Sequence, residues 1–393
     1  MISVGVGIGT GDDAYKAGLE ACGEALERLV PAPHRAVIVF SSVALDQDKL
    51  MNAVAKSASG ATIIGCSTAG EMSSDGLSTE HSVVVMGIAS DSVEFLSAIG
   101  HHVLWNPRGA GAEAAGDIQY RSRGYAKAAL LFFDVITGKG EDILRGAIER
   151  CGEHFPIFGA AAGDDLLFFE TYQYEGGRAY TGSVAALAFV GELSIGYGRA
   201  HGFLPIGTGR RVTRAEGSTL YEIDHMPAIE IYKEYFGEEY LPQLREGLLS
   251  GVAVTYPLGV SVENETYGYV LRNPVFIDAR GAMTFTANIP VGAEVRIMLS
   301  GKEEVLASAE QAAKEALVAL GGKTPKGAIV FNSIARKKLL GSAADEEIRV
   351  IQRVIGRDVP IAGFYGYAEV GGVVTNGMLQ FHNSSVGVLL FSE

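Results

Sequence analysis

The chain has 393 residues and a formal net charge of −14. Nucleic acids are bound mainly through Lys and Arg side chains that neutralise phosphates, and an anionic membrane surface attracts basic segments, so this charge argues against both partners. Hydrophobic residues make up 48% of the chain and charged residues 20%, which indicates a folded protein long enough for two or more fused units.

The N-terminus, the apolar runs and the cysteines bear on the cellular compartment. A signal peptide begins with a basic region that is followed by an apolar stretch, and residues 1–5 do not start such a pattern. We therefore expect no signal peptide. The richest apolar runs, 184–190 and 386–391, are much shorter than the ~20 residues of a membrane-spanning helix. Three cysteines, an odd and small number, fit a reducing compartment better than a disulfide framework. We therefore expect a cytoplasmic protein without membrane insertion.

In chain order, the predicted elements repeat. A short apolar strand is followed by a helix, a second strand with glycine at its end, a polar loop and a closing strand, and each set is preceded by a further strand and an alanine-rich helix. The sets lie at 36–88, 129–190 and 328–391, and the preceding strands at 2–8, 93–99 and 295–299. The order strand, helix, strand, helix, strand, strand thus begins near residues 1, 93 and 293, which leaves room for a degenerate fourth unit between about 193 and 292.

The region between the second and third repeats has a different pattern. Residues 211–214 and 219–223 flank a turn at 216–218 and predict a β-hairpin. Pro227 suits the first position of a helix that runs through Tyr235. Three further strands, with a turn between the last two, are predicted as an antiparallel meander at 267–271, 275–278 and 283–286.

Strands that alternate with helices imply βαβ crossovers and parallel pairing, to which the predicted hairpins add antiparallel strands. We therefore expect an α/β fold of duplicated mixed β-sheets with flanking helices. We divide the chain into two α/β domains, 1–210 and 211–393, although no linker-like composition marks the boundary.

Several motifs of common cofactor and metal sites are missing. Glycines fall on every second position from Gly5 to Gly11, whereas a dinucleotide site needs the spacing G-x-G-x-x-G, so we expect a turn before a helix capped by Asp12 or Asp13. The spacings His-x-x-His and Cys-x-x-Cys do not occur. We therefore predict no cofactor and no metal site of standard pattern.

The first candidate site is the loop 65–71, which follows a predicted buried strand. Open α/β sheets place ligands at this end of their strands. Cys66, Thr68 and Glu71 offer a thiol, a hydroxyl and a carboxylate there, and we predict that they bind a ligand. The alternative is a strand-to-loop turn whose cysteine behaves as a small hydrophobic residue.

The second candidate site is the corresponding loop of the last repeat. Tyr365, Tyr367 and Glu369 can form an aromatic wall with a counter-charge for an ammonium group. The alternative is aromatic packing with hydroxyls that reach water. The adjacent carboxyls Asp164 and Asp165 occupy the same place in the second repeat, and we interpret them as turn or cap residues.

Two basic side chains complete the candidates. Arg272 can serve as the clamp for a ligand carboxylate, because the guanidinium matches that group geometrically. A surface or interdomain ion pair is its alternative. His382 follows a predicted strand before the last one, and a structural role is its alternative.

The chain resembles the FIST family in several blocks. Residues 63–71 resemble the FIST N domain, and 269–274, 289–292, 363–369 and 381–383 resemble the FIST C domain. The resemblance implies a sensory role in signal transduction with small ligands, amino acids foremost. It carries over no catalytic residues. Because no segment resembles a kinase, cyclase or methyl-acceptor module, a separate signalling partner or a homo-oligomer interface would carry the output.

Three functional hypotheses follow. The first is a cytoplasmic sensor that binds an amino acid or similar metabolite between its two halves, with Glu71 or Glu369 at the ammonium, Arg272 at the carboxylate and Tyr365 or Tyr367 over the apolar part. The second is an enzyme that uses Cys66 as nucleophile, with His382 or Glu71 as base. The third is an interaction scaffold without a ligand. We favour the sensor over the enzyme.

Overall fold

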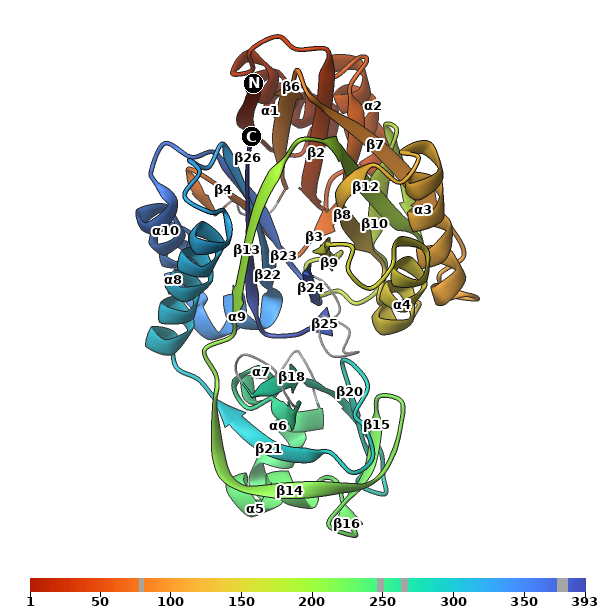
Figure 1. Cartoon of the computed structure of the whole chain (residues 1–393). Helices are drawn as coiled ribbons and strands as arrows, with labels where there is room; N and C mark the ends of the chain where they lie inside the picture. Colours follow the sequence, from red (N-terminus) through yellow and green to blue (C-terminus); the bar gives the residue numbers. More distant parts are fainter. Residues whose placement is uncertain (78–80, 246–250, 263–267, 373–380) are drawn as a thin grey trace.

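The computed structural model describes residues 1–77, 81–245, 251–262, 268–372 and 381–393. Three α/β units form the upper part of the molecule in Figure 1, and a segment inserted into the third unit forms the lower part. We call this segment the insert. None of the helices within the described ranges has the length and apolar character that crossing a bilayer requires.

Units 1 and 2 have the same order of elements. Unit 1 contains β1 (Ile2–Thr10), α1 (Ala14–Glu27), β2 (His34–Ser42), α2 (Gln47–Ser57), β3 (Thr62–Thr68), β4 (Glu71–Ser73), β5 (Gly76–Leu77) and β6 (Ser82–Ser90). Unit 2 contains β7 (Val93–Gly100), α3 (Pro107–Arg121), β8 (Ala126–Phe133), α4 (Gly140–Cys151), β9 (Ile157–Ala161), β10 (Tyr172–Glu175), β11 (Arg178–Thr181) and β12 (Val184–Gly191). The predicted repeat is therefore confirmed, with a pair of short strands added ahead of each closing strand.

Unit 3 follows the same order but is interrupted after its first strand. It contains β13 (Ser194–Ala200), then, after the insert, α8 (Lys302–Ala319), β22 (Gly327–Ser333), α9 (Ile334–Leu340), η3 (Gly341–Ala343), α10 (Ala344–Ile355), β23 (Ile361–Gly366), β24 (Glu369–Gly372), β25 (Phe381–His382) and β26 (Val386–Ser392). The prediction that this unit begins at 295–299 is wrong. β13 pairs with β26 as β1 pairs with β6, whereas β21 (Glu294–Leu299) pairs with strands of the insert.

The insert replaces the fourth repeat that the spacing had suggested. It contains β14 (Leu204–Glu216), β15 (Thr219–Ile223), β16 (Met226–Pro227), α5 (Glu230–Phe236), η1 (Glu238–Tyr240), α6 (Leu241–Arg245), α7 (Gly251–Thr255), β17 (Leu258–Ser261), β18 (Tyr269–Arg272), β19 (Pro274–Ile277), β20 (Met283–Phe285) and β21. The predicted hairpin is β14–β15, and the last two strands of the predicted meander are β19–β20. The predicted helix at Pro227 begins three residues later, because Pro227 pairs with β15.

The sheet of the insert has the order β18-β17-β21-β14-β15-β20-β19. β18 and β19 stand at opposite ends of this order, yet Asn273 is the single residue between them in the chain. The sheet must therefore curl until its two ends come together. Its inner side holds a separate hydrophobic core, in which Leu220, Tyr232, Met283 and Ile297 are fully buried.

The three units exchange short strands in a cycle. Each unit pairs its first, closing and two parallel strands in the same order, as in β1-β6-β2-β3. The pair β10–β11 of unit 2 then extends the sheet of unit 1 beside β3, β24–β25 of unit 3 extends unit 2 beside β9, and β4–β5 of unit 1 extends unit 3 beside β23. This exchange links every unit to the other two.

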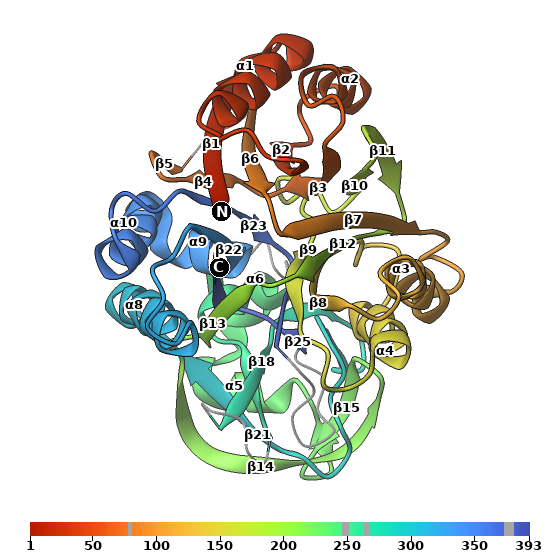
Figure 2. The same ribbon diagram turned by 45° about the horizontal axis from the view of Figure 1, so that its top comes forward.

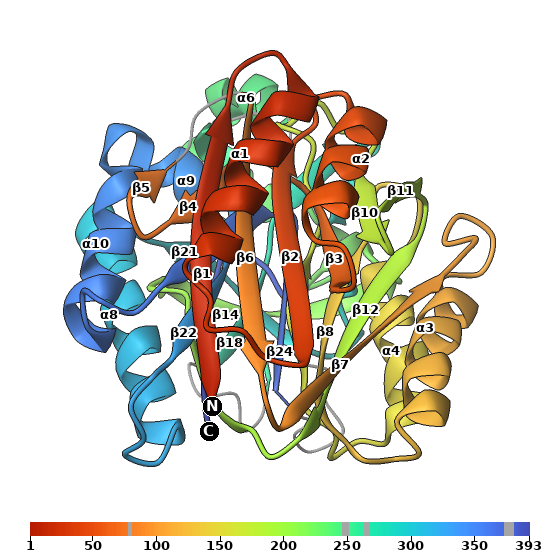
Figure 3. The ribbon, with the colours of Figure 1, turned by 90° about the horizontal axis from the view of Figure 1, so that it is seen from above.

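Helices cover the outer face of each sheet, as Figures 2 and 3 show for the pairs α1–α2, α3–α4 and α8–α10. The inner faces pack against one another. Phe40, Phe132 and Phe331 hold equivalent register positions in the three sheets, and they meet around Phe364 with ring centroids 4.7 to 6.4 Å apart. Aromatic contacts of this kind add to the free energy of burying the rings. The core therefore lies on the approximate threefold axis that relates the units.

Candidate functional site

The three loops that follow the second parallel strand of each unit meet near this axis. Backbone hydrogen bonds join them in a cycle at equivalent positions. Ala69 N donates to Tyr365 O at 2.8 Å, Gly163 N donates to Ser67 O at 3.0 Å, and Tyr367 N donates to Ala161 O at 3.3 Å. The loops that we singled out from the sequence are thus in direct contact, and each is held by the other two.

Glu71 is the first residue of β4, directly after the first of these loops, and is 1% exposed. Its carboxyl accepts a hydrogen bond from Thr68 Oγ1 at 2.5 Å and another from Ser82 Oγ. Burial raises the pKa of Glu71 to about 8, because an ionised carboxylate loses its hydration there. At neutral pH the carboxyl is therefore largely protonated. Thr68 and Glu71, which we predicted to contact a ligand, thus bond to each other as one buried pair.

Glu369 and Gln173 occupy the equivalent positions in the other two sheets. In the strand pairing, Glu71 lies opposite Phe364, Glu369 opposite Ala160 and Gln173 opposite Cys66. These three partners hold the same position in the second parallel strand of their units. Glu71, Glu369 and Gln173 each contact a serine just before or at the start of a closing strand, Ser82, Ser385 or Ser183. Burial also raises the pKa of Glu369 to about 8. Since glutamine is neutral, all three positions carry a neutral group at pH 7.

Cys66 lies inside β3 and is fully buried among the aromatic residues of the central core. Burial raises the pKa of its thiol well above the ordinary value, and the charge of Glu71 acts in the same direction. A nucleophilic cysteine needs a lowered pKa and access to substrate. The surroundings of Cys66 therefore oppose the enzyme hypothesis and match the alternative of a small hydrophobic residue.

The two predicted tyrosines are held by carboxylates of the protein. Tyr365 donates from its hydroxyl to Glu347 Oε2 at 3.2 Å. Tyr367 donates to the carboxylate of Asp164 and accepts from the backbone N–H of Leu166 at 3.1 Å. Its ring stacks on Phe168 with centroids 4.9 Å apart. Both rings are therefore held in place by contacts within the protein.

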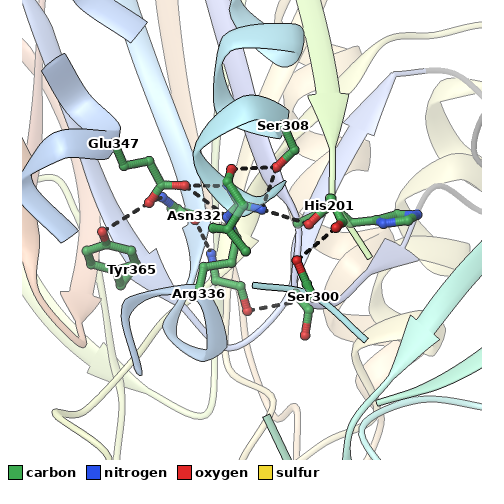
Figure 4. A network of polar contacts seen from close by, with 12 residues as sticks. His201, Ser300, Ser308, Asn332, Arg336, Glu347 and Tyr365 are labelled. Carbon is green, nitrogen blue, oxygen red and sulfur yellow. Dashed lines mark hydrogen bonds and ion pairs between the residues drawn. The ribbon is translucent and has the colours of Figure 1, made fainter. Parts of the chain in front are cut away.

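Tyr365 belongs to a buried polar network in unit 3, shown in Figure 4. Arg336 is its centre and donates five hydrogen bonds: two to Glu347 Oε1, and one each to His201 O, Ser308 Oγ and Val305 O. Those bonds use every N–H donor of the guanidinium. His201 follows β13 directly, and Ser300, which donates to Gly202 O at 2.8 Å, precedes α8. The network therefore lies where the chain enters and leaves the insert.

Arg272 and His382 lie at the junction between the insert and the units. Arg272 Nη2 is 3.2 Å from Glu141 Oε1, and both side chains are largely buried. Arg272 also donates to Asn288 O at 3.3 Å and Phe381 O at 3.4 Å. Burial lowers the pKa of His382 well below its ordinary value, so the imidazole is neutral at pH 7. In this structure Arg272 therefore forms an interdomain ion pair, which was the alternative to a ligand contact.

Two cavities border these residues. The strand-end cavity, of about 510 Å³, lies past the carboxyl ends of β2, β3 and β22 and is lined by residues of all three units, among them Ser42, Ala69, Asp165, Leu166, Ile334 and Lys337. The insert cavity, of about 400 Å³, lies between the insert and units 2 and 3 and is lined among others by Lys139, Glu141, Phe168, Phe285, Tyr367 and Phe381. Within the described ranges, no cluster of three or more His, Cys, Asp or Glu residues could hold a metal ion.

The eight predicted residues therefore do not share one cavity. Of the eight, only Tyr367 lines either of the two cavities. Sequence reasoning missed Lys337, and it interpreted Asp165 as a turn or cap residue. Asp164 is a cap of that kind, since it accepts from the N–H groups of Phe168, Phe169 and Glu170, whereas Asp165 lines the strand-end cavity.

Family models match almost the entire chain. The FIST N domain model matches residues 35–226, and the FIST C domain model matches residues 228–372. The chain belongs to the FIST family. FIST domains are sensory domains that have been suggested to bind small ligands. The FIST N match covers most of units 1 and 2 and the first strand of unit 3, and the FIST C match covers most of the insert and most of the rest of unit 3.

Two mycobacterial proteins are similar to this chain over almost their full length. Uncharacterized protein Rv0628c of Mycobacterium tuberculosis (strain ATCC 25618 / H37Rv) is 24% identical over 98% of this chain and 99% of its own length. Uncharacterized protein Mb0898c of Mycobacterium bovis is 24% identical over 99% of both chains. Among solved structures, a chorismatase has a TM-score of 0.36 at 10% identity, covering 100% of this chain and 98% of its own. A cyanuric acid hydrolase from A. caulinodans has a TM-score of 0.40 at 8% identity, covering 100% and 99%.

Proposed function

We propose that this FIST protein is a cytoplasmic sensor that binds a small zwitterionic metabolite, such as an amino acid, in the strand-end cavity. One observation carries the proposal: Lys337 and Asp165 line the same cavity but do not form an ion pair within 4.0 Å with each other. A ligand with both a carboxylate and an ammonium group can bind both. The cavity also lies between the two halves of the chain, at the strand ends where α/β sheets place ligands.

Lys337 is the expected partner of the ligand carboxylate. Its ammonium donates to Ala69 O at 2.8 Å and lies 5.5 Å from the centre of the Tyr365 ring. Within the part of the chain that the structure describes, no carboxylate lies within 4.0 Å of this ammonium. An ammonium has three N–H donors, so two remain after the bond to Ala69. The ring of Tyr365 and the bond to Ala69 hold the group in place before a ligand arrives.

Asp165 is the expected partner of the ligand ammonium. Its carboxylate accepts from Ser42 Oγ at 2.8 Å and from the backbone of Val43. A carboxylate has about four acceptor positions, so it retains capacity for an ammonium group. Its backbone has a φ of +54°, and the next residue, Leu166, has a φ of +66°. A bulky side chain seldom adopts that region, and such backbone strain is concentrated at ligand sites.

The residues predicted from the sequence have supporting roles in this proposal. Thr68 O accepts from Asp165 N at 3.2 Å, so the end of β3, which also contains Cys66 and is followed by Glu71, positions the backbone of Asp165. Tyr365 supports Lys337. Arg272, Tyr367, Glu369 and His382 lie toward the insert, and their direct contact with a ligand stays a prediction. A separate signalling protein or a second copy of the chain would carry the output.

Thermal unfolding in the presence of single metabolites tests the proposal. We expect at least one amino acid to raise the Tm in a saturable manner, since a ligand selective for the folded state must stabilise it. The same compound without its ammonium group, or as its methyl ester, should bind about tenfold more weakly or worse. Lys337→Met and Asp165→Asn should each reduce the affinity similarly, while Lys314→Met, an exposed lysine of unit 3, should not. The proposal fails if all amino acids leave the Tm unchanged, or if both variants bind like the original protein.

A further inference from the structure

The insert cavity differs in chemistry from the strand-end cavity, and the proposed function does not use it. It lies where unit 2, unit 3 and the insert meet. Lys139 and Glu141 come from the start of α4, Tyr367 and Phe381 from unit 3, and Phe285 from the insert. Ligand pockets favour such interfaces between parts of a protein.

Rigid aromatic rings form much of its wall. Phe285 and Phe381 are 3% and 2% exposed, so packing fixes both. Tyr367 is fixed at its hydroxyl by Asp164 and on its face by the stacked ring of Phe168. Val275 and Ala287 add aliphatic surface from the insert. Rings that are held in place before binding lose little conformational entropy when a flat ligand packs against them.

The charged groups around this cavity leave one positive charge in excess. Glu141 is neutralised by Arg272 at 3.2 Å, and its other oxygen accepts from Asn288 N at 3.3 Å. Lys139 also lines the cavity, and the described residues place no carboxylate within 4.0 Å of its ammonium. A ligand with a single negative charge would therefore find its counter-charge at Lys139.

We propose that the insert cavity is a second ligand site, which binds a small aromatic carboxylate. The ring of the ligand packs among Phe168, Tyr367 and Phe285, and its carboxylate meets Lys139. Because the ligand contacts both the insert and unit 2, its binding stabilises the interface between them. This site does not depend on the zwitterion site, since the two cavities differ in their charged residues and in their walls.

Benzoate is the probe, with benzamide as its uncharged counterpart, and isothermal calorimetry on the full chain measures binding. We expect saturable binding of benzoate, weakened about tenfold or more in Lys139→Met, with benzamide unaffected by that change. Lys127→Met, an exposed lysine of the same unit, is the matched control. Ser218→Trp places a large ring at a residue that lines the cavity and should abolish binding of both compounds.

Two results overturn the second site. One is the absence of saturable benzoate binding at concentrations up to roughly 10 mM. A dissociation constant above that value means a binding free energy of less than about 3 kcal/mol. The other is benzoate binding that Lys139→Met and Ser218→Trp both leave unchanged. Circular dichroism and the Tm confirm that each variant is folded. Lys337→Met should leave benzoate binding intact, so failure here and failure of the zwitterion site are separate outcomes.

Discussion

Unit 3 and the junction between the insert and unit 2 each contain an arginine–glutamate pair, and the two pairs have different surroundings. Arg336 and Glu347 are both 0% exposed, and all five donors of Arg336 are used within the protein. Arg272 and Glu141 are 6% and 14% exposed, and their contact is longer, at 3.2 Å. The first pair holds together the helices of one unit, whereas the second joins parts that are distant in the chain.

This difference indicates where the molecule can respond to a ligand. A fully buried pair with every donor satisfied has no alternative partner, because exchanging it would leave a charge without hydration. The pair at the junction borders a cavity and retains some contact with solvent. We therefore expect a ligand in the insert cavity to act on the junction pair, whereas the Arg336–Glu347 pair keeps its partners with or without a ligand.

The largest effect of a single substitution is expected at Arg336. Arg336→Met leaves Glu347 buried without its counter-charge and should lower the free energy of unfolding by about 3–5 kcal/mol. Urea denaturation measures the change. The double variant Arg336→Met with Glu347→Gln should recover a large part of the loss, since no charge then remains buried. A loss below about 1 kcal/mol in the single variant would show that the pair does not hold the unit together.

A smaller effect is expected at Arg272. Arg272→Met should lower the free energy of unfolding by about 1–3 kcal/mol, because Glu141 can regain part of its hydration. The same denaturation experiment applies, followed by limited proteolysis at the junction, which we expect to become faster. If Arg272→Met is as damaging as Arg336→Met, the contrast between the two pairs is wrong.

A dependence of stability on pH is expected from two buried carboxyls. Glu71 and Glu369 have folded-state pKa values of about 8, above the ordinary value of 4.5. The unfolded chain therefore loses these protons first, and stability should fall as pH rises from about 5 to about 8, by up to about 1.4 kcal/mol per pH unit for each carboxyl. Glu71→Gln with Glu369→Gln should remove most of this slope, because Gln173 already occupies the equivalent third position.

Urea denaturation at pH 5, 6.5 and 8 checks this prediction, with Glu153→Gln, a solvent-exposed carboxyl of unit 2, as the control. If the free energy of unfolding depends on pH in the double glutamine variant as it does in the original protein, both carboxyls are ionised in the folded protein at neutral pH. The threefold set of neutral groups would then be an incorrect description of the core.

The sequence was informative about local structure and less so about the candidate site. The run Arg336–Lys338 is the kind of charge cluster that usually forms a solvated helix face, so nothing in it distinguished the buried Arg336 from the cavity-lining Lys337. One available signal was overlooked. Glycines alternate in β13 at Gly196 and Gly198 as they do in β1, since side chains there would collide with the backbone of α8. That pattern marks the true start of unit 3.

By itself, the sequence determined the α/β class, the repeated order of strands and helices, and the loops that meet near the axis, because hydrophobic periodicity and glycine placement act over a few neighbouring residues. Only the tertiary structure decided the exchange of strand pairs among the units, the burial of Glu71 and Glu369, and the grouping of Asp165 with Lys337. These features depend on pairing between segments up to about 290 residues apart, such as β4 with β23, and short-range patterns do not specify such partners.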